Sequence, residues 1–164
     1  MNYLRDLNAK IPEAENFRYK EFIKSDTALR LGIPNVPREH AWVCIEKLAR
    51  NIIQPVRSHF GRMRITSGFR TVKLCKAIGS SAKSNHTRGQ AADIEPVDSD
   101  IRLFDVLEWI HENLEYRELI AEFFPQGWIH VAYRENANDR ILKLKDANHH
   151  YSRVSIDYIR NIYG

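Results

Sequence analysis

Residues 83–94 constrain this chain more than any other stretch, because they set an imidazole, His86, and a carboxylate, Asp93, seven residues apart. Between them Gly89 can turn the backbone, and residues 90–94 are small and increasingly apolar, which predicts a short strand that ends at the carboxylate. An imidazole and a carboxylate could be two of the ligands of a metal ion. A third ligand must then come from another part of the chain.

The third candidate ligand is His130. Residues 127–133 form an aromatic and β-branched run, which predicts a strand with His130 on the same face as Trp128 and Ala132. Two histidines and an aspartate, with a fourth position left for water, make the open three-ligand arrangement of a catalytic zinc site. The spacing alone leaves a structural interpretation open, because a strand histidine is more often a hydrogen-bonded, half-buried side chain, and Asp93 can equally serve a turn.

These residues resemble the motifs of the zinc D-alanyl-D-alanine carboxypeptidase family, which includes phage endolysin peptidases and is related to the hedgehog-type zinc fold. The resemblance covers most of the chain and is carried by ordered motifs: Asn16-Phe17, Ser25-Asp26-Thr27-Ala28, Leu31-Gly32-Ile33, Gln54-Pro55, Ser67-Gly68-Phe69-Arg70, Ser84-x-His86-x-x-Gly89-x-Ala91-x-Asp93 and Trp128-Ile129-His130-Val131. It implies a Zn²⁺-dependent peptidase that cleaves a bond involving D-amino acids in peptidoglycan stem peptides, with the metal on His86, Asp93 and His130.

Two further site residues follow from the motifs. Arg70 comes after a Gly-aromatic pair in a loop, where a guanidinium can pair with a carboxylate or a developing oxyanion, although a surface arginine is the ordinary alternative. The resemblance implies that Arg70 contacts substrate and that Ser84 lies in the substrate pocket.

The general base is the least settled part of the site. Several relatives place a glutamate three residues before the last histidine, where this chain has Gly127. Glu122, on the partner strand of a predicted hairpin, is our candidate, and Glu118 is the reserve because it shares the same strand face. Either could instead be a solvated charge. Three other histidines are weaker candidates, with one on a helix surface and two in a polar loop: His111, His149 and His150.

The order of elements predicts an α+β fold, with a mainly antiparallel sheet carrying the site and helices packed on one side. We expect one metallopeptidase domain over residues 1–164, in which residues 1–37 are an irregular arm that wraps the core. Expected helices cover 27–31, 38–60, 71–78, and a segment capped by Ser99 or Asp100. Pro55 should either kink the second of these helices or end its regular part near Gln54. Expected strands cover 62–67, 90–94, 118–123 and 127–133; residues 95–99 are a break, and 140–164 are a helical turn and a terminal helix.

Composition limits the partners. A chain of 164 residues can bury a core without disulfides, so Cys44 and Cys75 are expected as free thiols and any metal is free to be catalytic. The net charge of +4 favours an anionic partner such as the cell wall, but the basic residues are scattered, so we expect no nucleic-acid binding. No apolar run approaches the roughly 20 residues that span a bilayer, so no membrane insertion is expected.

The N-terminus lacks the pattern of a secretory signal, so we expect synthesis in a bacterial host cytoplasm and action on the cell wall, as a monomer, after phage-assisted release or in the virion. The alternative function is a non-catalytic zinc-binding module of the cell wall or a phage tail. Gly127 is the feature that favours this alternative.

Overall fold

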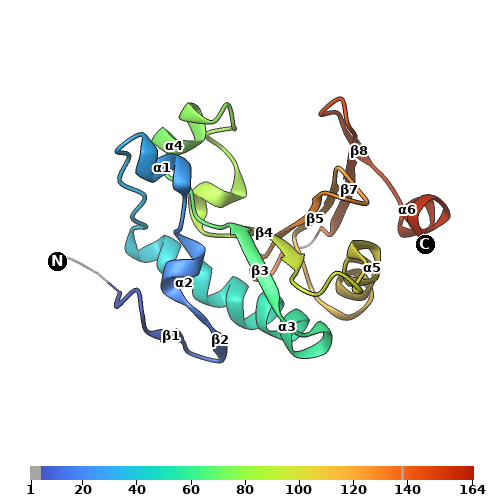
Figure 1. The fold of residues 1–164 in the computed structure, drawn as a ribbon, viewed down its shortest axis with the longest axis horizontal. Helices are drawn as coiled ribbons and strands as arrows, with labels where there is room; N and C mark the ends of the chain where they lie inside the picture. Colours follow the sequence, from blue (N-terminus) through green and yellow to red (C-terminus); the bar gives the residue numbers. More distant parts are fainter. Residues whose placement is uncertain (1–4, 138) are drawn as a thin grey trace.

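A six-stranded sheet organises the protein (Figure 1), and the computed structural model describes residues 5–137 and 139–164. The strand order is β3-β4-β6-β5-β7-β8, and every neighbouring pair is antiparallel except β5 and β7, which are parallel. This mostly antiparallel α+β architecture confirms the predicted fold class. The strands are β3 (Met63–Ser67), β4 (Ala91–Pro96), β5 (Glu118–Glu122), β6 (Trp128–Ala132), β7 (Ile141–Lys145) and β8 (Tyr151–Arg153).

The helices lie before, between and after these strands. They are η1 (Tyr19–Phe22), α1 (Asp26–Arg30), α2 (Glu39–Leu48), η2 (Ala49–Ile53), α3 (Gln54–Phe60), α4 (Val72–Ala77), η3 (Asn85–Arg88), α5 (Leu103–Asn113) and α6 (Ile156–Tyr163). The regular α-helix is interrupted just before Pro55, because the π-helical segment η2 separates α2 from α3. Proline has no N–H to donate and its ring crowds the preceding turn, which explains why the regular ladder is interrupted there.

The two faces of the sheet differ in polarity. Alternate residues of β5 and β6, such as Leu119, Ala121 and Ile129, are fully buried in the main core. The helix α5 packs on these two strands, and α3 packs on α5 and β3. The opposite face carries Glu118 and Glu122, so the sheet presents a polar floor on one side and an apolar surface to the helices on the other.

Three details of the predicted elements differ in the structure. Besides the expected short helix, residues 1–37 contain a hairpin that was not predicted, in which β1 (Lys10–Ile11) and β2 (Ala14–Arg18) pair antiparallel. The strand β4 does not end at Asp93 but continues to Pro96, where β3 supplies its antiparallel partner. The helix α5 begins after Arg102 without a side-chain cap, so neither Ser99 nor Asp100 caps it.

The C-terminal segment also differs from its prediction. The terminal helix is present as α6, but residues 141–153 form the two strands β7 and β8 rather than a helical turn. The physical reason is tertiary: β7 pairs with the open edge of β5, and Leu142 is buried in the main core. Within the described parts of the chain, none of the helices combines the length and apolarity required to cross a bilayer.

Candidate metal centre

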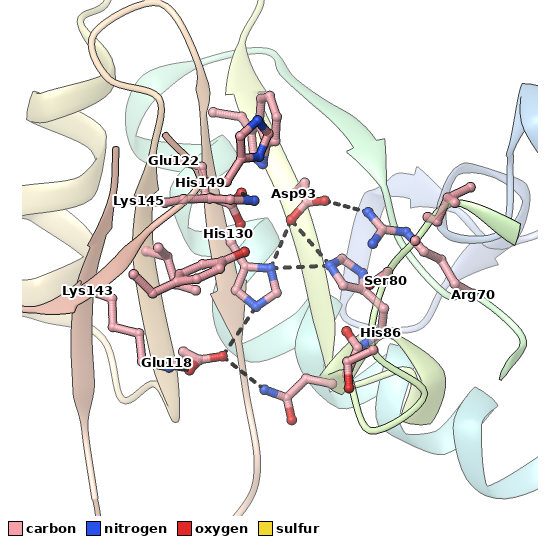
Figure 2. A pocket seen from close by; sticks show the side chains of 18 of the residues that line it. Arg70, Ser80, His86, Asp93, Glu118, Glu122, His130, Lys143, Lys145 and His149 are labelled. Atoms are coloured by element: carbon pink, nitrogen blue, oxygen red, sulfur yellow. Dashed lines mark hydrogen bonds and ion pairs between the residues drawn. The ribbon is translucent and has the colours of Figure 1, made fainter. Parts of the chain in front are cut away.

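The three predicted ligands meet at the floor of a cleft (Figure 2). His86 Nε2 lies 3.2 Å from His130 Nδ1 and 3.3 Å from Asp93 Oδ1. The distance between His130 Nδ1 and Asp93 Oδ1 is 2.9 Å. Zinc with ligand bonds of about 2.0–2.1 Å sets tetrahedral ligand atoms roughly 3.3–3.4 Å apart. The triangle therefore has nearly the size that zinc requires, and all three side chains are buried.

Local structure explains how the ligands are brought together. Asp93 and His130 are direct partners in the antiparallel pairing of β4 with β6, so their side chains share one face. His86 comes from η3, whose start is capped by Ser84 and whose end is the left-handed residue Gly89. A Cβ at Gly89 would lie 2.4 Å from the carbonyl oxygen of Ala41, so this motif position requires glycine for both conformation and space.

Each candidate ligand is fixed from behind by a second group. The Nδ1–H of His86 donates to the carbonyl of Gly68 at 2.6 Å, which leaves Nε2 as the free acceptor toward the triangle. His130 Nε2 lies 3.6 Å from Glu118 Oε1, and its Nδ1 faces the triangle. Such outer partners are the usual supports of metal-binding histidines, so the residues present fit a zinc ion.

Asp93 is supported by Arg70. Arg70 Nη2 donates to Asp93 Oδ2 at 2.8 Å, and Arg70 Nε donates to the hydroxyl of Ser67 at 2.7 Å. Asp93 therefore has one oxygen in the triangle and the other on the guanidinium. Arg70 and Ser84 both line the cleft, and the contact of Arg70 with Asp93 was not predicted from the sequence.

The charges of the site are strongly coupled. Burial lowers the pKa of His86. Burial alone would also lower the pKa of His130, but its hydrogen bond to Asp93 and its interaction with Glu118 raise that pKa to about 9. Burial alone would raise the pKa of Asp93, yet its interactions with His86 and His130 hold it well below the usual range. The interaction with His130, 3.6 Å away, lowers the pKa of Glu118 to about 2. The raised pKa of His130 favours a proton on its ring in the metal-free site, and a bound cation would compete with that proton.

The two candidate bases occupy different environments. Both are diagonal neighbours of His130 across the β5–β6 pairing, because the direct partner of His130 is Ile120. Glu118 is engaged by His130, and it also accepts hydrogen bonds from Asn85 and Lys143.

Glu122 is 6% exposed, and its Oε2 forms an ion pair with Lys145 Nζ at 2.9 Å. Glu118 is thus engaged by the candidate ligand His130, whereas Glu122 is paired with Lys145 beside the cleft.

Gly127 cannot carry the side chain that some relatives have at this position. A Cβ added to Gly127 would lie 1.8 Å from the backbone carbonyl oxygen of Glu122, far closer than atoms can approach. The turn between β5 and β6 therefore excludes a glutamate here unless its backbone shifts. A catalytic carboxylate must come from another position in this chain.

The wall of the cleft includes residues that the sequence analysis missed. The cleft has a volume of about 860 Å³, and β7 and β8 contribute Lys143, Lys145 and Tyr151 to its lining. The alternation of Leu142, Lys143, Leu144 and Lys145 was a strand signal that could have revealed them.

Two of the other candidate histidines, His149 and His111, lie in different parts of the structure. His149 lies in a loop between β7 and β8, as expected, and lines the cleft. His111 lies on α5, and its Nδ1 is 2.6 Å from the hydroxyl of Tyr116. Of these two, only His149 faces the candidate metal centre.

A buried His-Asp-His triangle on the polar face of an antiparallel sheet, at the floor of a peptide-sized cleft, is the kind of centre found in metallopeptidases. The family model of Peptidase M15 matches residues 15–132, a range that contains the three candidate ligands and both glutamates. The chain therefore belongs to the peptidase M15 family, whose peptidases are zinc-dependent, and the resemblance seen in the sequence is confirmed. A comparison with curated proteins finds no match.

Proposed function

We propose that this protein is a zinc-dependent peptidase that hydrolyses a peptide bond involving a D-amino acid in peptidoglycan stem peptides, as a D,D-carboxypeptidase or an endopeptidase of the endolysin type. The observation that carries the proposal is the zinc-sized triangle of ligand atoms from His86, Asp93 and His130 at the floor of the cleft. When bound there, zinc supplies the Lewis acidity that activates water at neutral pH and polarises a peptide carbonyl.

Glu122 is the proposed general base. It lies on the same face of the sheet as His130, in the next row of side chains along the strands. Two neighbouring rows are about 7 Å apart, a distance that a glutamate side chain can span. From there its carboxylate takes a proton from the attacking water and returns it to the leaving nitrogen. Glu118 is less suited to this role because His130, Asn85 and Lys143 occupy its oxygens.

Arg70 and Ser84 are the proposed substrate contacts. A guanidinium has five N–H donors, and the contacts with Ser67 and Asp93 use the one on Nε and one of the two on Nη2. The donors on Nη1 are then suited to a substrate carboxylate or to the oxyanion that develops at the scissile carbonyl. We expect the enzyme to act as a monomer on the bacterial cell wall, in phage lysis or in the virion.

Digestion of purified peptidoglycan tests the proposal. Walls of several chemotypes are incubated with the protein, with and without EDTA and with zinc restored, and the products are identified by mass spectrometry. Release of free D-alanine identifies a carboxypeptidase, and cleavage of cross-links identifies an endopeptidase. The Glu122→Gln variant should keep zinc and fold but lose at least about a hundredfold in rate. The matched control is Glu115→Gln, an exposed glutamate outside the cleft lining, which should keep the wild-type rate.

Gly127 supports a second candidate, a zinc-binding module of the cell wall or a phage tail that does not hydrolyse. It removes the carboxylate that some relatives carry three residues before the last histidine. Stoichiometric zinc binding without hydrolysis of any wall chemotype would favour this module over the peptidase.

A further inference from the structure

A row of four side chains crosses the sheet, two residues along the strands from the row that contains the candidate ligand His130. Glu122 on β5 is the register partner of Trp128 on β6 and of Lys145 on β7, and Lys145 is in turn the partner of Tyr151 on β8. All four residues line the cleft. The row therefore connects the proposed base to strands that lie beyond the matched family region, which ends at residue 132.

Lys145 is tightly held at the centre of this row. Its Nζ lies 2.9 Å from Glu122 Oε2, 4.9 Å from the centre of the Phe123 ring and 4.8 Å from that of Tyr151. Only 14% of the Lys145 side chain is exposed. A cation between two aromatic faces and a carboxylate has lost much of the rotational freedom of a surface lysine, so it can fix the position of its partner.

Glu122 needs such a partner. Its side chain is buried among neighbours of the cleft, where an unpaired carboxylate is costly and can rotate away from the reacting atoms. The ion pair with Lys145 engages Oε2 and leaves Oε1 for a proton. Figure 2 shows Lys145 and Glu122 side by side above His130, with Glu118 and Lys143 below it.

We propose that Lys145 is a positioning residue for Glu122, so that the hairpin of β7 and β8, outside the matched family region, completes the active site. This inference rests on the proposed peptidase function. The neighbouring pair of Lys143 with Glu118 has a different role, because Glu118 contacts His130 and the pair therefore supports a metal ligand. The strand β7 thus supports the base through one lysine and the metal centre through the other.

Steady-state kinetics on a purified cross-linked muropeptide test the inference. Lys145→Met should lower kcat about 10- to 100-fold with KM within about twofold and zinc content unchanged, because a displacement of the base affects turnover rather than binding. Lys145→Arg should recover part of the loss, because it restores a cation beside Glu122. Lys73→Met, an exposed lysine on α4 outside the cleft lining, should behave as wild type.

A double-mutant cycle separates positioning from general structural support. If Lys145 acts through Glu122, then adding Lys145→Met to Glu122→Gln should cause no further loss in kcat. Additive losses, or a Lys145→Met enzyme with wild-type kcat, would overturn the inference while leaving the peptidase function standing. Should Lys145→Met fail to fold, Lys145→Gln and Tyr151→Leu carry the same cycle. A wild-type protein that hydrolyses no wall chemotype would overturn the proposed function and this inference together.

Discussion

Replacing Glu118 by glutamine should weaken zinc binding without removing a ligand. Glu118 Oε1 lies 3.6 Å from His130 Nε2, on the side of the ring that faces away from the triangle. Glutamine keeps the shape but removes the charge, so the imidazole loses its ionised acceptor and becomes a weaker metal ligand. The protein should still fold, because the change is isosteric and lies at the cleft rather than in the main core.

The size of the effect follows from the contacts. Outer partners of metal-binding histidines typically contribute about 10- to 100-fold in metal affinity. Two further donors, Asn85 and Lys143, hold the carboxylate in place, so no large rearrangement is needed for the comparison. We therefore expect the zinc Kd to rise by about 10- to 100-fold.

Competition with a chromogenic chelator measures this change directly. The matched control is Glu122→Gln, the other diagonal neighbour of His130, which should bind zinc within about twofold of wild type because its ion pair is with Lys145. Equal zinc affinity in wild type and Glu118→Gln would refute the assignment of Glu118 as the support of His130. A large loss in both variants would show that the two glutamates are not functionally distinct.

Three more predictions follow from the same geometry. Arg70→Ala should lower turnover more than Arg70→Lys, since a planar fork serves Asp93 and substrate better than a point charge, and equal kcat in all three proteins would remove Arg70 from the site. Gly127→Ala should lower the free energy of unfolding by about 1–3 kcal/mol in urea titrations and reduce the rate, because its Cβ would meet the Glu122 carbonyl; unchanged stability would contradict the observed turn. Zinc affinity should rise about tenfold per pH unit up to about pH 9, because the raised pKa of His130 favours a proton that zinc must displace below that pH. Calorimetry in buffers of different ionisation enthalpy counts the released proton. A zinc affinity that does not change with pH would contradict this prediction.

Local patterns in the sequence predicted the floor of the site well. The placement of His130, Glu122 and Glu118 on one face of the sheet follows from the two-residue period of a strand. The β5–β6 hairpin itself was predicted from the turn residues between its two strands. The capping serine and left-handed glycine around His86 are also local signals. These features depend on neighbouring residues alone, which is why a single sequence reveals them.

Long-range pairing was harder to predict. The contact of Arg70 with Asp93 joins a loop to a strand 23 residues away, and neither residue type specifies that partner. The strands β7 and β8 were missed because the choice between strand and helix for residues 141–153 depends on the open edge of β5. The cleft wall that Lys143 and Lys145 form is thus a property of the assembled sheet.

Native mass spectrometry of the metal-loaded protein tests the central claim most directly. We predict one zinc per wild-type chain, and loss of that zinc in His86→Ala, Asp93→Ala and His130→Ala variants whose circular dichroism remains that of the folded protein. Retention of one zinc per chain by all three folded variants would contradict the assignment of this triangle as the metal centre.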